Sequence, residues 1–221
     1  VGPFTVFAYS GGLFGTTAGS LTNEELRQAT VQLQNTGVIA GTIYAPDGQT
    51  LATSGIVYVH HPSEITFYPS GIAQATLDAS GAYRFENLPL GTYNLSVRDA
   101  QGRLRAVVRT VVLATLGQVE TRNMTMIGLG TVRGQVLYDN AASTPASGVP
   151  VEVRSLTPTL GTVATATTNA GGFYEVQNVV VGSFTVSAGL PDQQLLGEGG
   201  SAIAAHGQIV VVDIVLQNNA L

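Results

Sequence analysis

One pattern, at residues 76–97, constrains the fold of this chain most, because a degenerate copy of it returns at residues 168–188. The two copies read TLDASGAYRFENLPLGTYNLSV and TNAGGFYEVQNVVVGSFTVSA. Each opens with a polar turn of Asp, Asn, Ser and Gly, residue types that favour tight reversals. Apolar and polar residues then alternate, as they do in antiparallel strands with one buried face. Each copy therefore predicts two half-buried strands that follow a tight turn.

The tail of this pattern occurs three times, as GPFTV, GTYNL and GSFTV, beginning at Gly2, Gly91 and Gly182. The copies recur about every 90 residues, which matches one small all-β domain and is far longer than a solenoid repeat. The period predicts three segments. Residues 1–36 form the C-terminal half of a preceding repeat, residues 37–127 the first complete repeat, and residues 128–221 the second.

The alternation predicts about seven strands in each complete repeat. In residues 1–36 we expect strands at 4–9 and 29–35, joined by a glycine-rich connection at 11–19, and the last strand, VQLQN, matches IVLQN at 214–218. The strands expected in the complete repeats, besides those of the repeated pattern, are 39–44, 56–60, 105–113 and 119–126 in the first, and 132–138, 149–154, 162–168 and 208–217 in the second. Short connections at 36–38 and 127–130 carry no flexible spacer.

Composition favours assembly and excludes several functions. Charged residues make up 10% of the 221 residues, against roughly 25% in ordinary soluble domains. No run approaches the ~18 apolar residues of a membrane helix, so we expect no membrane insertion. The nine basic residues are scattered arginines in a chain of net charge −5, which argues against nucleic-acid binding. Without cysteine there is neither a disulfide nor a thiolate. No signal peptide is visible, which fits a processed chain or a segment of a longer one.

The arrangement resembles a known family. The resemblance rests on four motifs: a strand with a central glycine (IAGTI, residues 39–43), an Asp-Gly turn, TLDASGAYRF at 76–85 and LPLGTY at 88–93. Together they are similar to the carboxypeptidase regulatory-like domain, a transthyretin-like (prealbumin-like) β-sandwich. The resemblance implies all-β, tandem Greek-key sandwiches that serve as accessory, adhesive or stalk modules of secreted and surface proteins. The second repeat departs from the motif at Asn169 and at 179–182, where we expect a looser turn.

No constellation of residues predicts catalysis, a cofactor or a metal site. His60 and His61 are adjacent on a predicted strand, so they point to opposite faces and do not share an ion. We expect both at an exposed strand end, and His206 in a polar loop. The aspartates lie in turns without the dense spacing of a calcium loop. The serines lack a nucleophile elbow. The chain is therefore predicted to be no enzyme.

Outward-facing apolar residues predict the interaction surface. If Phe4, Val6 and Ala8 face the core, Phe7 and Tyr9 face away from it, where the other copies carry Thr, Asn or Ser. Exposed apolar patches usually mark interfaces. The candidate interface residues are Phe7, Tyr9, Phe14, Val211 and Val215.

These observations predict a non-enzymatic structural or adhesive repeat segment of a large secreted or cell-surface protein, part of a fibre, stalk or other assembly. The expected partners are other copies of the chain, neighbouring repeats, or an extracellular glycan or protein. The alternative is a carbohydrate- or protein-binding accessory module of a secreted enzyme, using Tyr44, Tyr58, Tyr68 and Tyr138. We also expect Tyr93 and Phe184 to be buried at equivalent sites. Strands from outside the segment are expected to cover Phe4 and Leu33.

Overall fold

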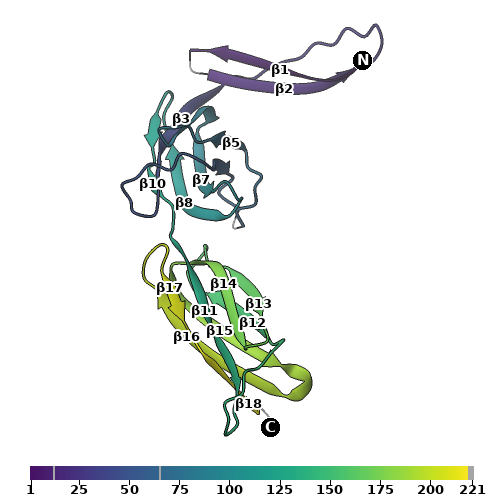
Figure 1. The fold of residues 1–221 in the computed structure, drawn as a ribbon. Coiled ribbons are helices and arrows are strands. Elements are labelled where there is room, and N and C mark those ends of the chain that lie inside the picture. The colour runs from purple at the N-terminus through teal and green to yellow at the C-terminus, as the bar shows by residue number, and fades with distance from the viewer. Residues whose placement is uncertain (12, 65, 219–221) are drawn as a thin grey trace. The chain divides into compact units, whose positions relative to one another are not determined.

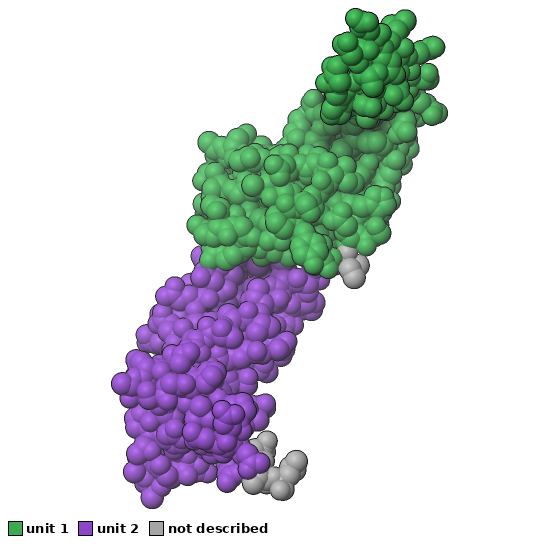
Figure 2. Space-filling model, turned by 90° about the vertical axis from the view of Figure 1, so that its right-hand side faces the viewer, with its two compact units in different colours: residues 1–126 green, residues 127–221 purple. Residues whose placement is uncertain are grey.

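A computed structural model describes residues 1–11, 13–64 and 66–218, so residues 219–221 of the predicted third segment lie outside it. The chain divides into two compact units, Val1–Met126 and Ile127–Leu221 (Figure 2). Apart from one turn of 3₁₀ helix at Pro191–Gln193, the regular structure of the described residues is β-strand (Figure 1). The predicted all-β fold class is confirmed.

The first unit contains an N-terminal hairpin and a β-sandwich, which we call the first sandwich. Its strands are β1 (Gly2–Ser10), β2 (Leu13–Leu21), β3 (Gln34–Tyr44), β4 (Ile56–His60), β5 (Ala73–Thr76), β6 (Ala82–Pro89), β7 (Gly91–Arg98), β8 (Leu104–Leu113), β9 (Val119–Thr121) and β10 (Met124–Thr125). One sheet has the order β5-β4-β7-β8, and in the other β3 pairs with antiparallel β6 and with parallel β9 and β10. The two sheets enclose one apolar core.

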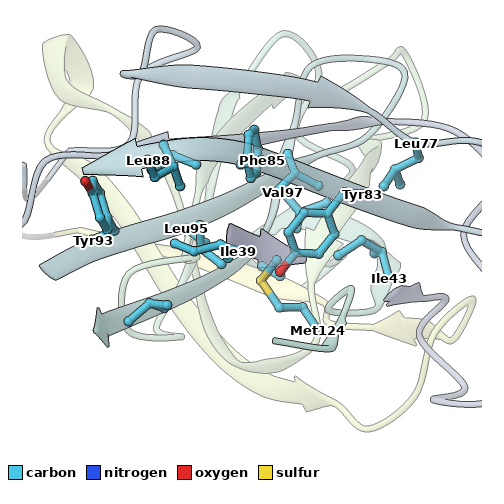
Figure 3. Close-up of a cluster of buried hydrophobic side chains, with 14 of the residues drawn as sticks. Ile39, Ile43, Leu77, Tyr83, Phe85, Leu88, Tyr93, Leu95, Val97 and Met124 are labelled. Carbon is cyan, nitrogen blue, oxygen red and sulfur yellow. The ribbon is translucent and has the colours of Figure 1, made fainter. Parts of the chain in front are cut away.

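Alternate residues of both sheets fill that core, as the period of two requires. Figure 3 shows Tyr83 and Phe85 from β6, Tyr93 and Leu95 from β7, and Ile39 from β3 gathered in it. Tyr93 is buried, which confirms the prediction from the sequence.

The second unit is a β-sandwich, which we call the second sandwich. Its strands are β11 (Leu129–Tyr138), β12 (Pro150–Ser155), β13 (Val163–Thr167), β14 (Phe173–Val180), β15 (Gly182–Leu190), β16 (Leu195–Ile203), β17 (Ile209–Val211) and β18 (Ile214–Asn218). The order is β13-β12-β15-β16-β18-β11-β14, and β17 also pairs with β11. Phe184 lies in its core, as expected, and is fully buried.

In each sandwich the backbone of the last strand passes very close to the central glycine of the opening strand. We call this close contact, at Gly41 in the first sandwich and Gly134 in the second, the shared crossing. In the first sandwich the last strand is split into β9 and β10, and the two residues between them, Arg122 and Asn123, lie beside Gly41 and Thr42 of β3 in an unchanged register. The Tyr83 hydroxyl donates to the Arg122 carbonyl oxygen at 2.6 Å, and the Asn123 side chain accepts from the Thr42 amide at 2.9 Å. A side chain at Gly41 would collide with the same Arg122 carbonyl group. Only glycine lets the two backbones approach this closely.

The second sandwich repeats this crossing with different residues. The Tyr174 hydroxyl donates to the Val212 carbonyl oxygen at 2.7 Å, and Asp213 accepts from the Gln135 amide at 2.8 Å. Gly134 lies against the Val212 carbonyl group. Burial raises the pKa of Tyr174 to about 12, with a smaller contribution from the nearby Asp213 carboxylate. Burial raises the pKa of Tyr83 as well, so both hydroxyls stay protonated and keep donating at neutral pH.

The repeated turn is also preserved, although Asn replaces Asp in the second copy. Asp78 Oδ1 accepts from the amides of Ser80 and Ala82 at 2.8 and 3.0 Å. Asn169 Oδ1 accepts from the amides of Gly171 and Phe173 at 2.9 and 3.1 Å. The expectation of a looser second turn is wrong, because the amide oxygen accepts the same two bonds as the carboxylate.

Four local predictions were wrong, two of them because the strands are rich in glycine. The glycine-rich connection expected at 11–19 is largely strand β2, and the equivalent glycine-rich strand β16 was not predicted. Both carry glycines, which weaken a strand signal. The strand expected at 29–35 is irregular through residue 33. Strand β3 begins at Gln34 and runs without a break through residues 36–38, where a connection was expected.

Candidate interaction surfaces

The N-terminal hairpin carries three aromatic side chains on one face. β1 and β2 pair antiparallel with Phe7 opposite Thr16 and Tyr9 opposite Phe14. The ring centroid of Phe14 lies 6.3 Å from that of Phe7 and 5.1 Å from that of Tyr9. Phe7 and Tyr9 are 57% and 63% exposed, as the alternation predicts. We call Phe7, Tyr9 and Phe14 the aromatic face.

Val211 and Val215 lie in the second unit, and both are exposed, at 59% and 45%. They line two neighbouring depressions that share Asp213. Val211 belongs to the larger, of about 640 Å³, and Val215 to one lined also by Leu196 and Glu198. The second sandwich therefore presents its own exposed apolar residues among polar ones.

The depression beside Val211 combines one exposed ring with polar groups. Phe173, 56% exposed, pairs across the strands with Gln135. Arg133 lies between Glu175 of β14 and Val211 of β17 in the pairing register. Phe173 was not among the interface residues predicted from the sequence, although its outward position follows from the alternation with buried Tyr174.

His60 contradicts the expected exposed strand end, because it is fully buried. Its Nδ1 lies 2.8 Å from Glu64 Oε2 and its Nε2 lies 2.7 Å from Ser96 Oγ. Nδ1–H donating to the carboxylate leaves Nε2 to accept from the Ser96 hydroxyl. His61 is exposed, and its Nδ1 lies 3.0 Å from Ser63 Oγ.

Serine, histidine and a carboxylate in this order form the hydrogen-bond chain of a hydrolytic triad. Ser96 and His60 are both 0% exposed, however, and the ring of Phe67 packs edge-on against His60 at 5.1 Å. A nucleophile has to reach its substrate. The network therefore satisfies buried polar groups and holds the overlying segment in place.

That segment, residues 61–64 and 66–72, which we call the strap, covers the outer face of the β4-β7-β8 sheet. Asn94 donates to three strap carbonyl groups, those of His61, Pro62 and Glu64, at 3.3–3.5 Å. Arg98 donates to the Phe67 carbonyl oxygen. The guanidinium of Arg109 lies 4.8 Å from the centre of the Phe67 ring. The first sandwich thus has a second buried layer that the sequence analysis missed.

A charged cluster lies near the same sheet, at the turn between β7 and β8. Asp99 accepts from Arg105 and Arg103, each at 2.8 Å, with Asp99 and Arg105 both buried. Burial by itself would raise the pKa of Asp99, but the bonds from Arg105 and Arg103 outweigh it and hold the pKa below its ordinary value. The cluster is paired within itself, so it anchors the turn.

The tyrosines proposed for glycan stacking do not form a platform. Tyr58 is buried, Tyr44 and Tyr138 are half-buried, and Tyr68 is the exposed one, at 64%. His206 is exposed, as expected, and its Nδ1 lies 3.1 Å from the amide nitrogen of Leu129. Across residues 1–11, 13–64 and 66–218, no group of three His, Cys, Asp or Glu side chains is placed to hold a metal ion. The same residues include no helix with the length and hydrophobicity to cross a bilayer.

Comparison with known sequences gives two much longer relatives. The chain is 31% identical over 178 residues to chitinase ChiA of Flavobacterium johnsoniae, an alignment with 78% of this chain and 10% of the chitinase. It is 28% identical over 155 residues to colossin-A of Dictyostelium discoideum, with 58% of this chain and 1% of that protein. The chain thus spans a tenth or less of the length of these relatives. No family profile matches it.

Comparison with solved structures gives pilin proteins. The minor pilin of Streptococcus agalactiae matches 82% of this chain and 96% of its own, with a TM-score of 0.51 and 12% identity. A streptococcal ancillary pilin matches 96% of this chain and 75% of its own, with a TM-score of 0.48 and 13% identity. The likeness to the minor pilin concerns the fold alone. This chain and that pilin share an all-β architecture of β-sandwiches.

Proposed function

We propose that this chain is a non-enzymatic structural or adhesive segment of a large secreted or cell-surface protein. It consists of carboxypeptidase regulatory-like repeats, which associate with other copies or neighbouring repeats. The aromatic face is the observation that carries the proposal. The exposed rings of Phe7 and Tyr9 pack around Phe14, and this apolar surface has no role in the core of the hairpin. The equivalent positions of the second sandwich are Ser187 and Gly189, which carry no large apolar side chain. Such surface is typical of an interface.

Two further observations support this proposal. The matched relatives are many times longer than the chain, as expected of a module reused within large proteins. The shared fold with a minor pilin is compatible with a role in surface assemblies. The proposal assigns Phe7, Tyr9 and Phe14 to the contact, with Val211 and Val215 as a second surface.

Sedimentation velocity over a range of concentrations tests this function. We expect the wild-type chain to associate as concentration rises and the variant Phe7→Ser/Tyr9→Ser to remain monomeric. Tyr68→Ser, which removes another exposed ring, is the matched control and should associate like wild type. Equal association of the wild type and the double variant would overturn the assignment of the aromatic face.

A second candidate function is a glycan-binding accessory module, and the depression around Phe173 favours it. An exposed ring beside Arg133, Gln135 and Asp213 offers a stacking surface with hydrogen-bonding groups at its edge. The similarity to a segment of a chitinase makes chitin oligosaccharides the first ligands to test. Titration calorimetry should then detect binding that Phe173→Ala abolishes and Tyr68→Ala preserves. The absence of binding to wild type would remove this candidate.

A further inference from the structure

The N-terminal hairpin, β1 and β2, has the same residue-by-residue pairing as β15 and β16 of the second sandwich. In β1 and β2, Ala8 lies opposite Gly15, as Ala188 lies opposite Gly197 in β15 and β16. The next connection is copied too. Leu13 pairs with Asn35 where β2 meets β3, and Leu195 pairs with Asn218 where β16 meets β18. The same three-strand arrangement is therefore built twice.

The packing beneath these strands is equivalent as well. A side chain at Gly15 would collide with the Gln32 carbonyl group and the side chain of Val31. At Gly197 it would collide with the Val215 carbonyl group and the side chain of Ile214. The match between VQLQN at 31–35 and IVLQN at 214–218 thus corresponds to one packing geometry.

The two copies differ at the outer edge of the hairpin. β15 pairs on that edge with β12, whereas β1 pairs within the described chain with β2 alone. Three side chains that β12 and its neighbours bury in the second sandwich have partly exposed equivalents in β1. Val186 is fully buried, whereas Val6, which occupies the same position, is 37% exposed. Phe4 and Ala8, the equivalents of Phe184 and Ala188, are half-buried.

We infer that the free edge of β1 accepts an extended strand of the β12 kind, with valines at alternate positions, in the antiparallel register that β12 adopts on β15. The occupant is a front-half strand from a repeat of this same type. In β12, Val153 lies opposite Val186 and Arg154 opposite Thr185. A bound strand therefore places its equivalents of these residues opposite Val6 and Thr5.

Physical chemistry favours this occupant. A strand edge with unpaired amide and carbonyl groups is a template for pairing. Backbone hydrogen bonds supply affinity in such strand addition, and the alternate side chains supply specificity. Valines at alternate positions would cover Val6 and Ala8 as Val153 and Val151 cover the equivalent positions of β15. This inference rests on the proposed association between repeats and deepens it. The edge of β1 is distinct from the aromatic face, so failure of the peptide to bind here would leave the association test of Phe7 and Tyr9 unaffected.

The first test uses a fluorescent peptide with the sequence of residues 149–156, titrated into the full chain. We expect saturable binding and hydrogen-exchange protection of β1 amides. A matched peptide with serine at the positions of Val151 and Val153 should bind at least about tenfold more weakly, because it loses two apolar contacts. Equal binding of the two peptides, or protection confined to β15, would overturn the inference.

The second test checks the register by disulfide cross-linking. The chain contains no cysteine, so an introduced cysteine is the sole thiol that can react. Thr5→Cys is introduced at an exposed position of β1, and peptides carry cysteine in place of either Arg154 or Glu152. Directly opposite residues meet the distance needed for a disulfide, whereas residues offset by two do not. Under glutathione buffer, the peptide with cysteine at 154 should cross-link several-fold faster than the one with cysteine at 152. Equal rates, or the reverse order, would contradict the proposed register.

Discussion

The two sandwiches have separate cores built on the same inward pattern, and they differ in what covers their outer sheet. In the first, the outer face of β4 and β7 is buried beneath the strap: Tyr58 and His60 are both buried, and the His60 ring packs against Phe67 of the strap. In the second, the equivalent positions are Glu152 and Arg154, which pair with each other at 2.8 Å on an open face. The inward pattern thus specifies the sandwich, and the outward residues decide whether a further layer is added.

The core aromatics should give the largest effects, and the effects should be confined to one unit. Truncating a buried aromatic costs about 3–5 kcal/mol. Tyr93→Ala should therefore lower the melting temperature of the first unit, and Phe184→Ala that of the second. Calorimetry of the full chain resolves the two transitions. If either variant lowered both transitions equally, the independence of the two cores would be wrong.

The strap should give the next largest effect, and only in the first unit. His60→Leu leaves the Ser96 hydroxyl and the Glu64 carboxylate without their shared partner. An unsatisfied buried group costs about 1–3 kcal/mol. Arg154→Leu, at the equivalent position on the open face, is the control and should change stability by less than about 0.5 kcal/mol. Denaturant unfolding of both variants measures the difference, and equal losses would mean that the strap does not depend on His60.

The shared crossing should give a smaller effect of equal size in both units. Tyr83→Phe and Tyr174→Phe each remove one hydrogen bond to a backbone carbonyl group. The expected loss is about 0.5–1.5 kcal/mol for each variant. Calorimetry should show each transition shifted by a similar amount. A loss in one unit alone would show that the two crossings are not energetically equivalent.

The repeated turn should give the smallest effect, visible as a pH dependence. Hydrogen bonds from Ser80 and Ala82 hold the pKa of Asp78 below its ordinary value. The bonds to its carboxylate are therefore fully present above the ordinary pKa and are lost as pH falls through the lowered one. Asn169 makes equivalent bonds and does not titrate.

Asp78→Asn should accordingly flatten the acid side of the first unit's stability profile and leave the second unit unchanged. Thermal melts between about pH 2 and pH 6 measure this slope. Asp99 also loses its stabilising charge in acid, so part of the slope should remain in the variant. An unchanged slope would show that the turn contributes nothing to the acid response.

Much of the molecule follows from its sequence, because period-two alternation and turn chemistry are local signals. They predicted the all-β class, the burial of Tyr93 and Phe184, and the outward positions of Phe7 and Tyr9. The internal matches located equivalent strands far apart in the chain. The grouping of Phe14 with those two rings also needed the pairing register of the hairpin.

Only the tertiary structure decided the remaining features, because they depend on which distant segments of the chain pack against each other. Gly15 and Gly197 weaken the local strand signal, yet β2 and β16 are strands because another segment packs directly on these glycines. The sequence places His60 at an exposed strand end, whereas in the structure the strap covers it and it is fully buried. Alternation tells which face of a strand is apolar. It does not tell whether a distant segment folds over the other face, and that choice depends on contacts such as those of Phe67 and Asn94 with residues some 30 positions away.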